Sequence, residues 1–398
     1  MNIGIALLRS SPDGSSSSGD FASVDTFAAH LVESGVQVTL LAPKLNRRLT
    51  YRKKAYTPVE WSDSRLLPNI IRYVREARRL CREVDLLACH LLFPSFSIVG
   101  DLVSWGTDTP IVTHFGIPLI ARWSWSDTLS SGARLWYLSR RLVNNWPCAR
   151  LSRFCCDAYV VSSQYQRQQL LALGVEEKKA IVIPNCTNVR YYRKSARHIA
   201  RRALGLPADA ALVCYLGHPT PTKGIQYLIE AFPLVLARHP NSKLVLALDR
   251  PNGFRRKLVG QVQLLGLERK VTWLDRVDVP RLLSAADVLV LPYLTDFGTH
   301  MFPSSMLEAL SVGVPLVSSD LPIIREVITD GQTGLLAPAG DSVAIAERIL
   351  RLLADADLRE SMVAAQREVA HKRFDARGGI EKYLHLCERV IDGKRKAR

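Results

Sequence analysis

The sequence predicts an α/β fold built on parallel sheets, and three observations support this prediction. The run Asp287–Pro292 is short, continuously apolar and rich in valine and leucine, as expected for a strand buried on both faces of a sheet. Apolar residues recur at helical spacing after Pro303, and Pro315–Val317 again has the pattern of a buried strand. A strand, a helix and a second strand in this order form a βαβ unit. The 398 residues are enough for two domains with separate cores.

The composition is that of a soluble globular protein, with 47% hydrophobic and 23% charged residues. The first residues, MNIGIALLRSS, have no basic region before a long apolar segment and therefore predict a buried strand and not a signal peptide. The longest apolar stretch, Leu86–Val99, is interrupted by His90 and Pro94 and is too short to span a bilayer. The eight cysteines show no metal-ligand spacing. We therefore expect reduced thiols and a cytoplasmic protein.

The charge is strongly positive, with a formal net charge of +16 and a pI near 9.7. Such a balance favours anionic partners, whether lipid, nucleic acid or phosphorylated substrates. Basic residues interleaved with aromatics between Trp123 and Trp146, and in a second cluster, suit a lipid headgroup interface. The alternative is a solvated basic face. We expect contact with the inner face of an anionic membrane, and no specific nucleic acid. The basic residues of the second cluster are Lys44, Arg47, Arg48, Arg52, Lys53 and Lys54.

The first half of the chain begins with a βαβ pattern. Ile3–Leu8 is the expected first strand, an amphipathic helix ends at Gly35, and Val36–Leu41 is the second strand. The loop between the first strand and the helix, SSPDGSSSSGDFAS, contains small residues that let backbone amides approach a substrate closely. Serine-rich loops are, however, more often plain linkers.

Two further expected strands of this half each have a histidine near their carboxyl end. Apolar residues at helical spacing predict a helix that starts near Asn69. The strand Asp85–His90 and the strand of residues 110–116 are expected after it. His114 comes at the carboxyl end of the latter, where ligands of parallel sheets bind, and is therefore a candidate site residue. The alternative is an ordinary structural histidine. His90 has the weaker case.

The second half opens with the buried strand Ala211–Leu216 after an arginine-rich linker, Val189–Pro207. Gly217 ends this strand, and Lys223 stands at the amino end of the next helix. A lysine there adds charge to amides that already point toward an anion, which predicts a phosphate site. The alternative is a solvated lysine at a helix start.

Other elements follow from the same patterns. A basic tail, GKRKAR, is expected to be disordered. The remaining expected strands are Ala158–Ser162, Lys243–Leu248 and Val271–Leu274, and the remaining helices are Val343–Leu353, Leu358–His371 and Gly378–Ile391.

The helix after Pro303 is the second candidate site. Its amino end faces the carboxyl edge of the predicted sheet, and Glu308 lies within its first turns. Because proline has no N–H, the phosphate-facing amides of this loop would come from Phe302, Ser304 and Ser305.

Two runs near the end of the chain carry a resemblance to a known family. The runs LEALSVGVPLVSSD and EVITDGQTGLLAPAGD resemble the signature of the retaining, nucleotide-sugar-dependent GT-B glycosyltransferases, which include sucrose and trehalose-type synthases and bacterial envelope mannosyl- and glucosyltransferases. The resemblance extends over nearly the whole chain. It implies two Rossmann-like domains facing across a crevice, residues 1–188 on the acceptor side and 189–375 binding the nucleotide sugar. Residues 376–398 would form a helix that crosses back to the first domain, and the basic tail.

The resemblance also implies roles for single residues. Glu308 corresponds to the second glutamate of a Glu-x7-Glu pair and would hold the donor ribose, whereas His300 replaces the first. Lys223 matches a lysine that grips the diphosphate, and His218 stands where the family has an arginine. The segment Cys186–Asn188 replaces a Gly-Val-Asp hinge.

The first domain has matching positions as well. His114 is similar to a histidine near the 6-position of the donor sugar, and Gly19 and Asp20 lie in the family's glycine-rich loop toward the acceptor. The nucleobase would be expected near Asp275–Val277.

The predicted function is transfer of a sugar from a nucleoside diphosphate donor to a glycan or lipid-linked acceptor, with retention. His114, His300 and Lys223 would be the catalytic residues, and no cofactor or metal is implied. The alternative functions are a GT-B scaffold protein with weakened catalysis, a natural-product glycosyltransferase, a GT-B phosphorylase and an epimerase. A phosphorylase would need a lysine motif that carries pyridoxal, and the sequence has none. An epimerase would need acidic residues at the site, and the sequence does not place them there. A Rossmann oxidoreductase is disfavoured because no Gly-x-Gly-x-x-Gly follows the first strand.

Overall fold

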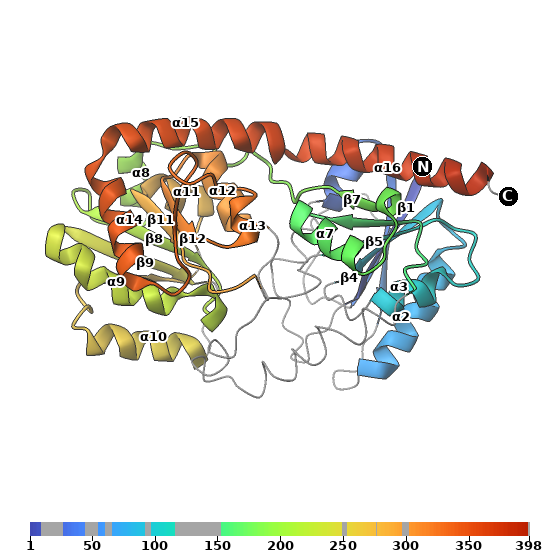
Figure 1. Ribbon diagram of the computed structural model, residues 1–398, viewed down its shortest axis with the longest axis horizontal. Helices are drawn as coiled ribbons and strands as arrows, with labels where there is room; N and C mark the ends of the chain where they lie inside the picture. The colour runs from blue at the N-terminus through green and yellow to red at the C-terminus, as the bar shows by residue number, and fades with distance from the viewer. Residues whose placement is uncertain are drawn as a thin grey trace. The chain divides into compact units, whose positions relative to one another are not determined.

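The structure, a computed structural model, divides into two compact units. Unit 1 is Met1–Asn185 with Ala376–Arg398, and unit 2 is Cys186–Asp375. Both are drawn in Figure 1, coloured along the chain. The residues that the structure describes are 1–8, 27–43, 55–59, 66–91, 97–115, 153–248, 253–275, 277–296 and 302–396.

Unit 1 contains a parallel sheet whose strands, within the described residues, lie in the order β3-β2-β1-β4-β5-β6-β7. The order reverses at β1, so that β1 and β4 are neighbours although a second and a third strand come between them in sequence. The strands are β1 (Asn2–Leu8), β2 (Gln37–Pro43), β3 (Ala55–Val59), β4 (Leu86–Leu91), β5 (Ile111–Phe115), β6 (Ala158–Val161) and β7 (Ala180–Val182).

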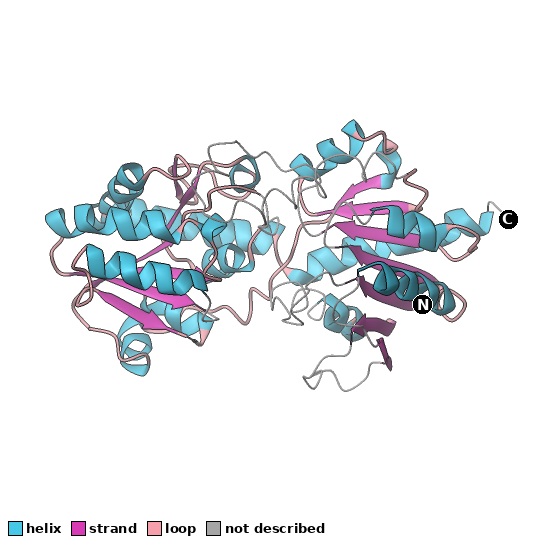
Figure 2. Ribbon diagram, turned by 90° about the horizontal axis from the view of Figure 1, so that it is seen from below, coloured by secondary structure: helices cyan, strands magenta, loops and turns pink. Residues whose placement is uncertain are grey.

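Helices cover both faces of this sheet (Figure 2), and the side chains of its central strands are buried on both sides. In β4, for example, Leu87 and Cys89 belong to one core cluster and Leu86 and Ala88 to the other. The described helices of unit 1 are the helical residues 27–33, α2 (Leu66–Leu80), α3 (Ser97–Ser104), α7 (Gln164–Ala172), the short turn η2 (Glu177–Lys179) and α16 (Ala376–Lys396).

The C-terminal helix α16 packs on the sheet of unit 1, as the sequence predicted for a helix that crosses back. Ile380, Tyr383 and Leu386 are buried in the same core cluster as Ile3 and Ile5 of β1. The prediction of a disordered tail was wrong: α16 continues to Lys396. Two interactions fix its last turns, the buried side chain of Ile391 and an ion pair of 3.0 Å between Lys394 Nζ and Asp157 Oδ1.

Unit 2 contains a second parallel sheet, with the order β10-β9-β8-β11-β12-β13 in the described residues. Its strands are β8 (Ala211–Gly217), β9 (Ser242–Leu248), β10 (Val271–Leu274), β11 (Val288–Leu291), β12 (Leu316–Ser319) and β13 (Leu335–Ala337). Its helices are α8 (Arg197–Ala203), η3 (Pro221–Lys223), α9 (Ile225–Arg238), α10 (Gly253–Leu264), α11 (Val279–Ala285), α12 (Ser304–Val312), α13 (Pro322–Arg325), α14 (Ser342–Ala354) and α15 (Ala356–Arg373).

The βαβ unit predicted around residues 287–317 is present. β11 pairs in parallel with β12, and α12 lies between them in the chain. The helix ends at Val312, and Gly313 after it adopts the left-handed conformation with φ 76°. Pro303 is the residue before the helix, where its missing N–H leaves no intrahelical hydrogen bond unmade.

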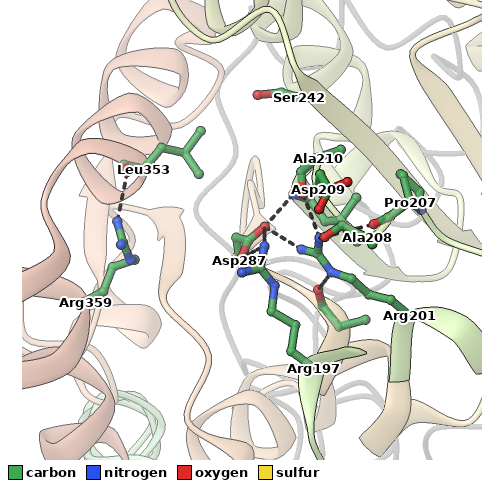
Figure 3. Close-up of polar contacts among 12 residues, drawn as sticks. Arg197, Arg201, Pro207, Ala208, Asp209, Ala210, Ser242, Asp287, Leu353 and Arg359 are labelled. Atoms are coloured by element: carbon green, nitrogen blue, oxygen red, sulfur yellow. Dashed lines mark hydrogen bonds and ion pairs between the residues drawn. The ribbon is translucent and has the colours of Figure 1, made fainter. Parts of the chain in front are cut away.

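The segment expected to be a linker instead contains helix α8, which is fixed to the sheet by a buried arginine. Arg201 is 1% exposed, and its Nη2 donates to Asp287 Oδ2 over 2.7 Å. Its other nitrogens donate to the carbonyl oxygens of Ala285, Pro207, Ala208 and Ala210 (Figure 3). The same carboxylate oxygen of Asp287 accepts from the backbone N–H of Leu212 in β8. This network joins α8 to the amino ends of β8 and β11.

Arg201→Met should destabilise unit 2 by about 3–5 kcal/mol, because Asp287 and the surrounding carbonyls would lose a buried partner. Arg197→Met is the matched control, since Arg197 also pairs with Asp287 but is 52% exposed, and we expect a loss below about 1 kcal/mol. Thermal unfolding followed by circular dichroism measures both. Equal losses would contradict the role of Arg201 in holding α8.

Candidate functional site

The site in unit 2 lies where the strand order reverses. β8 and β11 are hydrogen-bonded neighbours, and parallel sheets bind ligands at the carboxyl ends of such a strand pair. Gly217 is the last residue of β8, and His218 follows it, with its carbonyl accepting from the hydroxyl of Tyr215 over 3.2 Å. Lys223 ends the short turn η3 that leads into α9. His218 and Lys223 therefore both come just after the carboxyl end of β8.

A close backbone contact ties this turn to the end of β11. Gly224 has φ 71°, and a Cβ atom built on it would lie 1.7 Å from the carbonyl oxygen of Pro292. In addition, the N–H of Leu294 donates to the carbonyl of Thr222 over 2.9 Å. Only glycine satisfies both the left-handed conformation and the close approach.

This contact brings Lys223 beside the residue that follows Pro292. The Nζ atom of Lys223 lies 4.7 Å from the ring centroid of Tyr293, within cation–π distance. Tyr293 is 2% exposed, and burial raises the pKa of its phenol above the ordinary value, so the phenol stays neutral. Its hydroxyl is 3.5 Å from Ser305 Oγ in the first turn of α12. Lys223 and the start of α12 are thus connected through Tyr293.

The residue before Pro303 is held in an unusual conformation. Phe302 has φ 58°, in the left-handed region that non-glycine residues rarely adopt, and its side chain is 2% exposed. Its ring packs edge-to-face on Phe374 with a centroid distance of 5.6 Å. The burial holds Phe302 in this conformation. The first amides of α12, those of Ser304 and Ser305, have no carbonyl partner within the helix, as at every helix start.

Glu308 lies in the second turn of α12, largely removed from water. Its Oε1 accepts a hydrogen bond of 2.8 Å from the hydroxyl of Tyr192. Burial raises the pKa of Glu308 above its ordinary value, and the bond from Tyr192 acts in the opposite direction. The pKa of Tyr192 is raised, first by burial and then by the nearby charge of Glu308. Sequence reasoning placed Tyr192 in a linker and missed it.

Two histidines of unit 1, His90 and His114, form a cluster with the C-terminal helix. His114 is the penultimate residue of β5, and His90 holds the equivalent place in the neighbouring β4. Their rings stack at 4.1 Å. His114 Nε2 is 3.1 Å from the hydroxyl of Tyr383 in α16, and Phe27 packs at 4.7 Å from the Tyr383 ring.

Both imidazoles are neutral at ordinary pH. Burial lowers the pKa of His90 to about 3. Burial, and then the positive charge that His90 would carry, lower the pKa of His114 well below its usual value. The Nε2 atom of His90 is buried and, in the part of the chain that the structure describes, lacks a hydrogen-bond partner.

Comparison with known proteins matches both units to glycosyltransferases. A family profile described as glycosyl transferases group 1 matches residues 196–369, and a profile described as glycosyltransferase family 4 matches residues 21–191. The chain belongs to the GT-B glycosyltransferases.

Solved structures share the fold of this GT-B family member over almost its whole length. Anabaena HepE, crystallised with UDP and glucose, has a TM-score of 0.74 at 21% identity and covers 97% of this chain and 99% of its own. Sucrose-phosphate synthase from Thermosynechococcus elongatus has a TM-score of 0.78 at 20% identity and covers 98% of this chain and 99% of its own. At these identities the likeness shows the GT-B fold alone.

A curated relative is the phosphatidyl-myo-inositol mannosyltransferase of Mycobacterium leprae, 34% identical over 219 residues. The match covers 54% of this chain and 54% of the relative. This GT-B chain therefore spans about half the length of the curated relatives it matches.

Several predicted residues of this GT-B protein lie outside the described ranges, namely Gly19, Asp20, His300, the basic residues from Lys44 to Lys54 and the region from Trp123 to Trp146. In the expected nucleobase loop, Asp275 and Val277 are described and residue 276 is not. The roles assigned to all the site residues stay predictions. Among the described residues, no group of three or more His, Cys, Asp or Glu side chains is placed to hold a metal ion. None of the described helices is long and apolar enough to cross a membrane.

Gly224→Ala should destabilise this GT-B protein by about 3–5 kcal/mol, because the left-handed backbone and the clash with Pro292 add together. Gly205→Ala is a matched control in the same unit. Gly205 has φ 64° and no atom within 4 Å of its would-be Cβ, so only the backbone term of about 1–2 kcal/mol applies. Thermal unfolding distinguishes the two. A Gly224→Ala loss no larger than that of Gly205→Ala would show that the turn relaxes without strain.

Proposed function

We propose that the protein transfers a sugar from a nucleoside diphosphate sugar to an acceptor, with retention of configuration at the anomeric carbon. The observation that carries this proposal is the connected set Lys223, Tyr293, Ser305 and Glu308 at the carboxyl edge of the unit 2 sheet. It offers a cation and helix-start amides beside a carboxylate, which are the groups that a diphosphate and a ribose require.

In this proposal Lys223 and the first amides of α12 bind the diphosphate, and Glu308 accepts hydrogen bonds from the ribose hydroxyls. The bond between the anomeric carbon and the diphosphate oxygen breaks, a bond to the acceptor oxygen forms on the same face, and the acceptor proton passes to the departing diphosphate. Lys223 favours this step because it stabilises the negative charge that develops on the leaving group. The UDP and glucose bound to Anabaena HepE support a nucleotide-sugar donor.

The acceptor is proposed to be a lipid-linked or other glycan at a membrane surface. The relative from Mycobacterium leprae is named for action on a phosphatidyl-inositol lipid, which supports this class. In unit 1, the neighbouring helices α2 and α3 (Figure 1) expose apolar side chains, with Ile71 62% exposed and Trp105, just past α3, 76% exposed. Arg78 donates to the carbonyl of Trp105 and joins the two elements. The exposed arginines beside these side chains are Arg72, Arg75, Arg78, Arg79 and Arg82.

We call the surface formed by these exposed residues the α2–α3 face. Its members are Ile71, Arg72, Arg75, Arg78, Arg79, Arg82 and Trp105. Arginine and tryptophan exposed together suit the headgroup region of an anionic membrane, where each basic residue contributes about 1 kcal/mol. This face would contact the membrane in addition to the Lys44–Lys54 cluster, for which the sequence analysis already predicted membrane contact.

A second candidate function is a GT-B scaffold protein with weakened catalysis, favoured by His218 and His300 at positions where the family has charged groups of other kinds. Titration calorimetry with UDP and GDP, followed by donor hydrolysis assays, separates the two. Nucleotide binding with no turnover on any acceptor or on water would favour the scaffold.

Glu308→Ala should weaken nucleotide binding by about 1.5–3 kcal/mol, or roughly 10- to 150-fold in Kd, because hydrogen bonds to a carboxylate are lost. Glu347→Ala in α14 is the control, since Glu347 is exposed on the same unit. His300→Glu, measured on the same donor, tests the family position of His300. If Glu308→Ala leaves UDP and GDP binding unchanged, the assignment of this helix to the donor is wrong.

The α2–α3 face predicts binding to vesicles that contain anionic lipid, weakened by salt. Replacing Arg72, Arg75 and Arg79 by glutamine should reduce the partition coefficient by about two orders of magnitude, at about 1 kcal/mol each. Replacing the exposed Arg202, Arg238 and Lys257 of unit 2 changes the net charge equally and should have little effect. Co-sedimentation over a range of anionic lipid fractions measures both. Equal losses in the two triple variants would contradict a specific face.

A further inference from the structure

The segment that precedes α8 is fixed to unit 2 at both ends. At its start, the N–H of Thr187 donates to the carbonyl of Phe374 over 2.8 Å. At its end, the N–H of Ser195 donates to Ser284 Oγ over 3.0 Å. Between them Val189 is 5% exposed and anchors the segment in the core. The segment is therefore held in a defined position against α11 and α15.

The first anchor is also linked to α12. Phe374, whose carbonyl receives the N–H of Thr187, packs edge-to-face on Phe302. Phe302 is two residues before the start of α12 and has the left-handed backbone described above. The segment and the amino end of α12 thus share one buried aromatic pair, which fixes Tyr192 relative to Glu308.

The two adjacent tyrosines of the segment differ in what their hydroxyls contact. The Tyr192 hydroxyl donates to Glu308 Oε1 over 2.8 Å, whereas Tyr191 is 64% exposed. Their rings pack edge-to-face at 5.1 Å, so each ring supports the other. Within the described residues, the second carboxylate oxygen of Glu308 makes no hydrogen bond.

We propose that Tyr192 is a positioning residue, which fixes one oxygen of Glu308 so that the other is aimed at the ribose of the nucleotide. This inference rests on the proposed function, in which Glu308 receives the ribose. A carboxylate has room for several hydrogen bonds, so one donor from the protein leaves acceptor positions for the ligand. A carboxylate held in place before binding loses less side-chain freedom when the ligand arrives.

The same hydrogen bond favours the charged form of Glu308. Burial alone raises the pKa of Glu308, and donation from Tyr192 stabilises the ionised form. The second titratable group that faces it is Tyr293, in the loop after β11, whose phenol is neutral because burial raises its pKa. Loss of the Tyr192 hydroxyl should therefore raise the pKa of Glu308 further. Nucleotide binding, which needs the carboxylate, would then fall off at a higher pH as the solution is acidified.

The test is Tyr192→Phe, which removes the hydroxyl and keeps the ring, with Tyr191→Phe as the control that removes the neighbouring hydroxyl. UDP and GDP binding is measured by calorimetry from pH 5 to pH 8. Tyr192→Phe should raise Kd about three- to tenfold at neutral pH, as for the loss of one supporting hydrogen bond, and should move the acid limit of binding to higher pH. Tyr191→Phe should match the natural protein in both respects.

A measurement without ligand complements this. The carboxyl carbon of Glu308, assigned by its absence in Glu308→Ala, is titrated by nuclear magnetic resonance, and its midpoint should move upward in Tyr192→Phe alone. If Glu308→Ala weakens nucleotide binding but Tyr192→Phe behaves as Tyr191→Phe in Kd, acid limit and carboxyl midpoint, Tyr192 has no positioning role. If Glu308→Ala leaves binding unchanged, the proposed donor site fails and this inference fails with it.

Discussion

The carbonyl oxygen of Pro292 approaches Gly224 so closely that no side chain fits between them, and the arrangement of the unit 2 site depends on this contact. It brings the turn after β8 against the residue that follows β11, two strands that are neighbours in the sheet but far apart in sequence. Lys223 precedes the glycine and Tyr293 follows the proline, so the contact places the cation over the aromatic ring. A parallel sheet brings the strand ends together, but this contact determines which side chains meet there.

The carboxylate of Glu308 shows how the site balances opposing effects. Removal from water disfavours its charged form, and a neutral acid would offer a nucleotide one acceptor fewer. One neutral donor, the Tyr192 hydroxyl, offsets part of this effect without introducing a positive charge that would compete with the ligand. Lys223 instead contacts the ring of Tyr293, whose phenol is neutral because burial raises its pKa.

The sequence predicted those features that depend on local pattern. Continuous apolar runs identified β8 and β11, and the helical spacing of apolar residues after Pro303 identified α12. It failed where a polar residue acts through distant partners. Arg201 and Tyr192 lie in an arginine-rich stretch with no apolar run, so their partners Asp287 and Glu308 could not be found from spacing. The basic tail was predicted to be disordered, whereas the ion pair of Lys394 with Asp157 fixes it to unit 1 next to the buried Ile391.

The histidine pair of unit 1 differs from the unit 2 site because it presents no charge. Burial keeps both rings neutral, and a neutral imidazole can donate from one nitrogen and accept at the other. In His114 the Nε2 nitrogen is engaged by Tyr383 of α16. Any role of His114 toward a sugar hydroxyl would therefore fall to its Nδ1 nitrogen, and Tyr383 would decide whether that nitrogen donates or accepts. Through Tyr383, the C-terminal helix thereby occupies one hydrogen-bonding position of a residue at the end of β5.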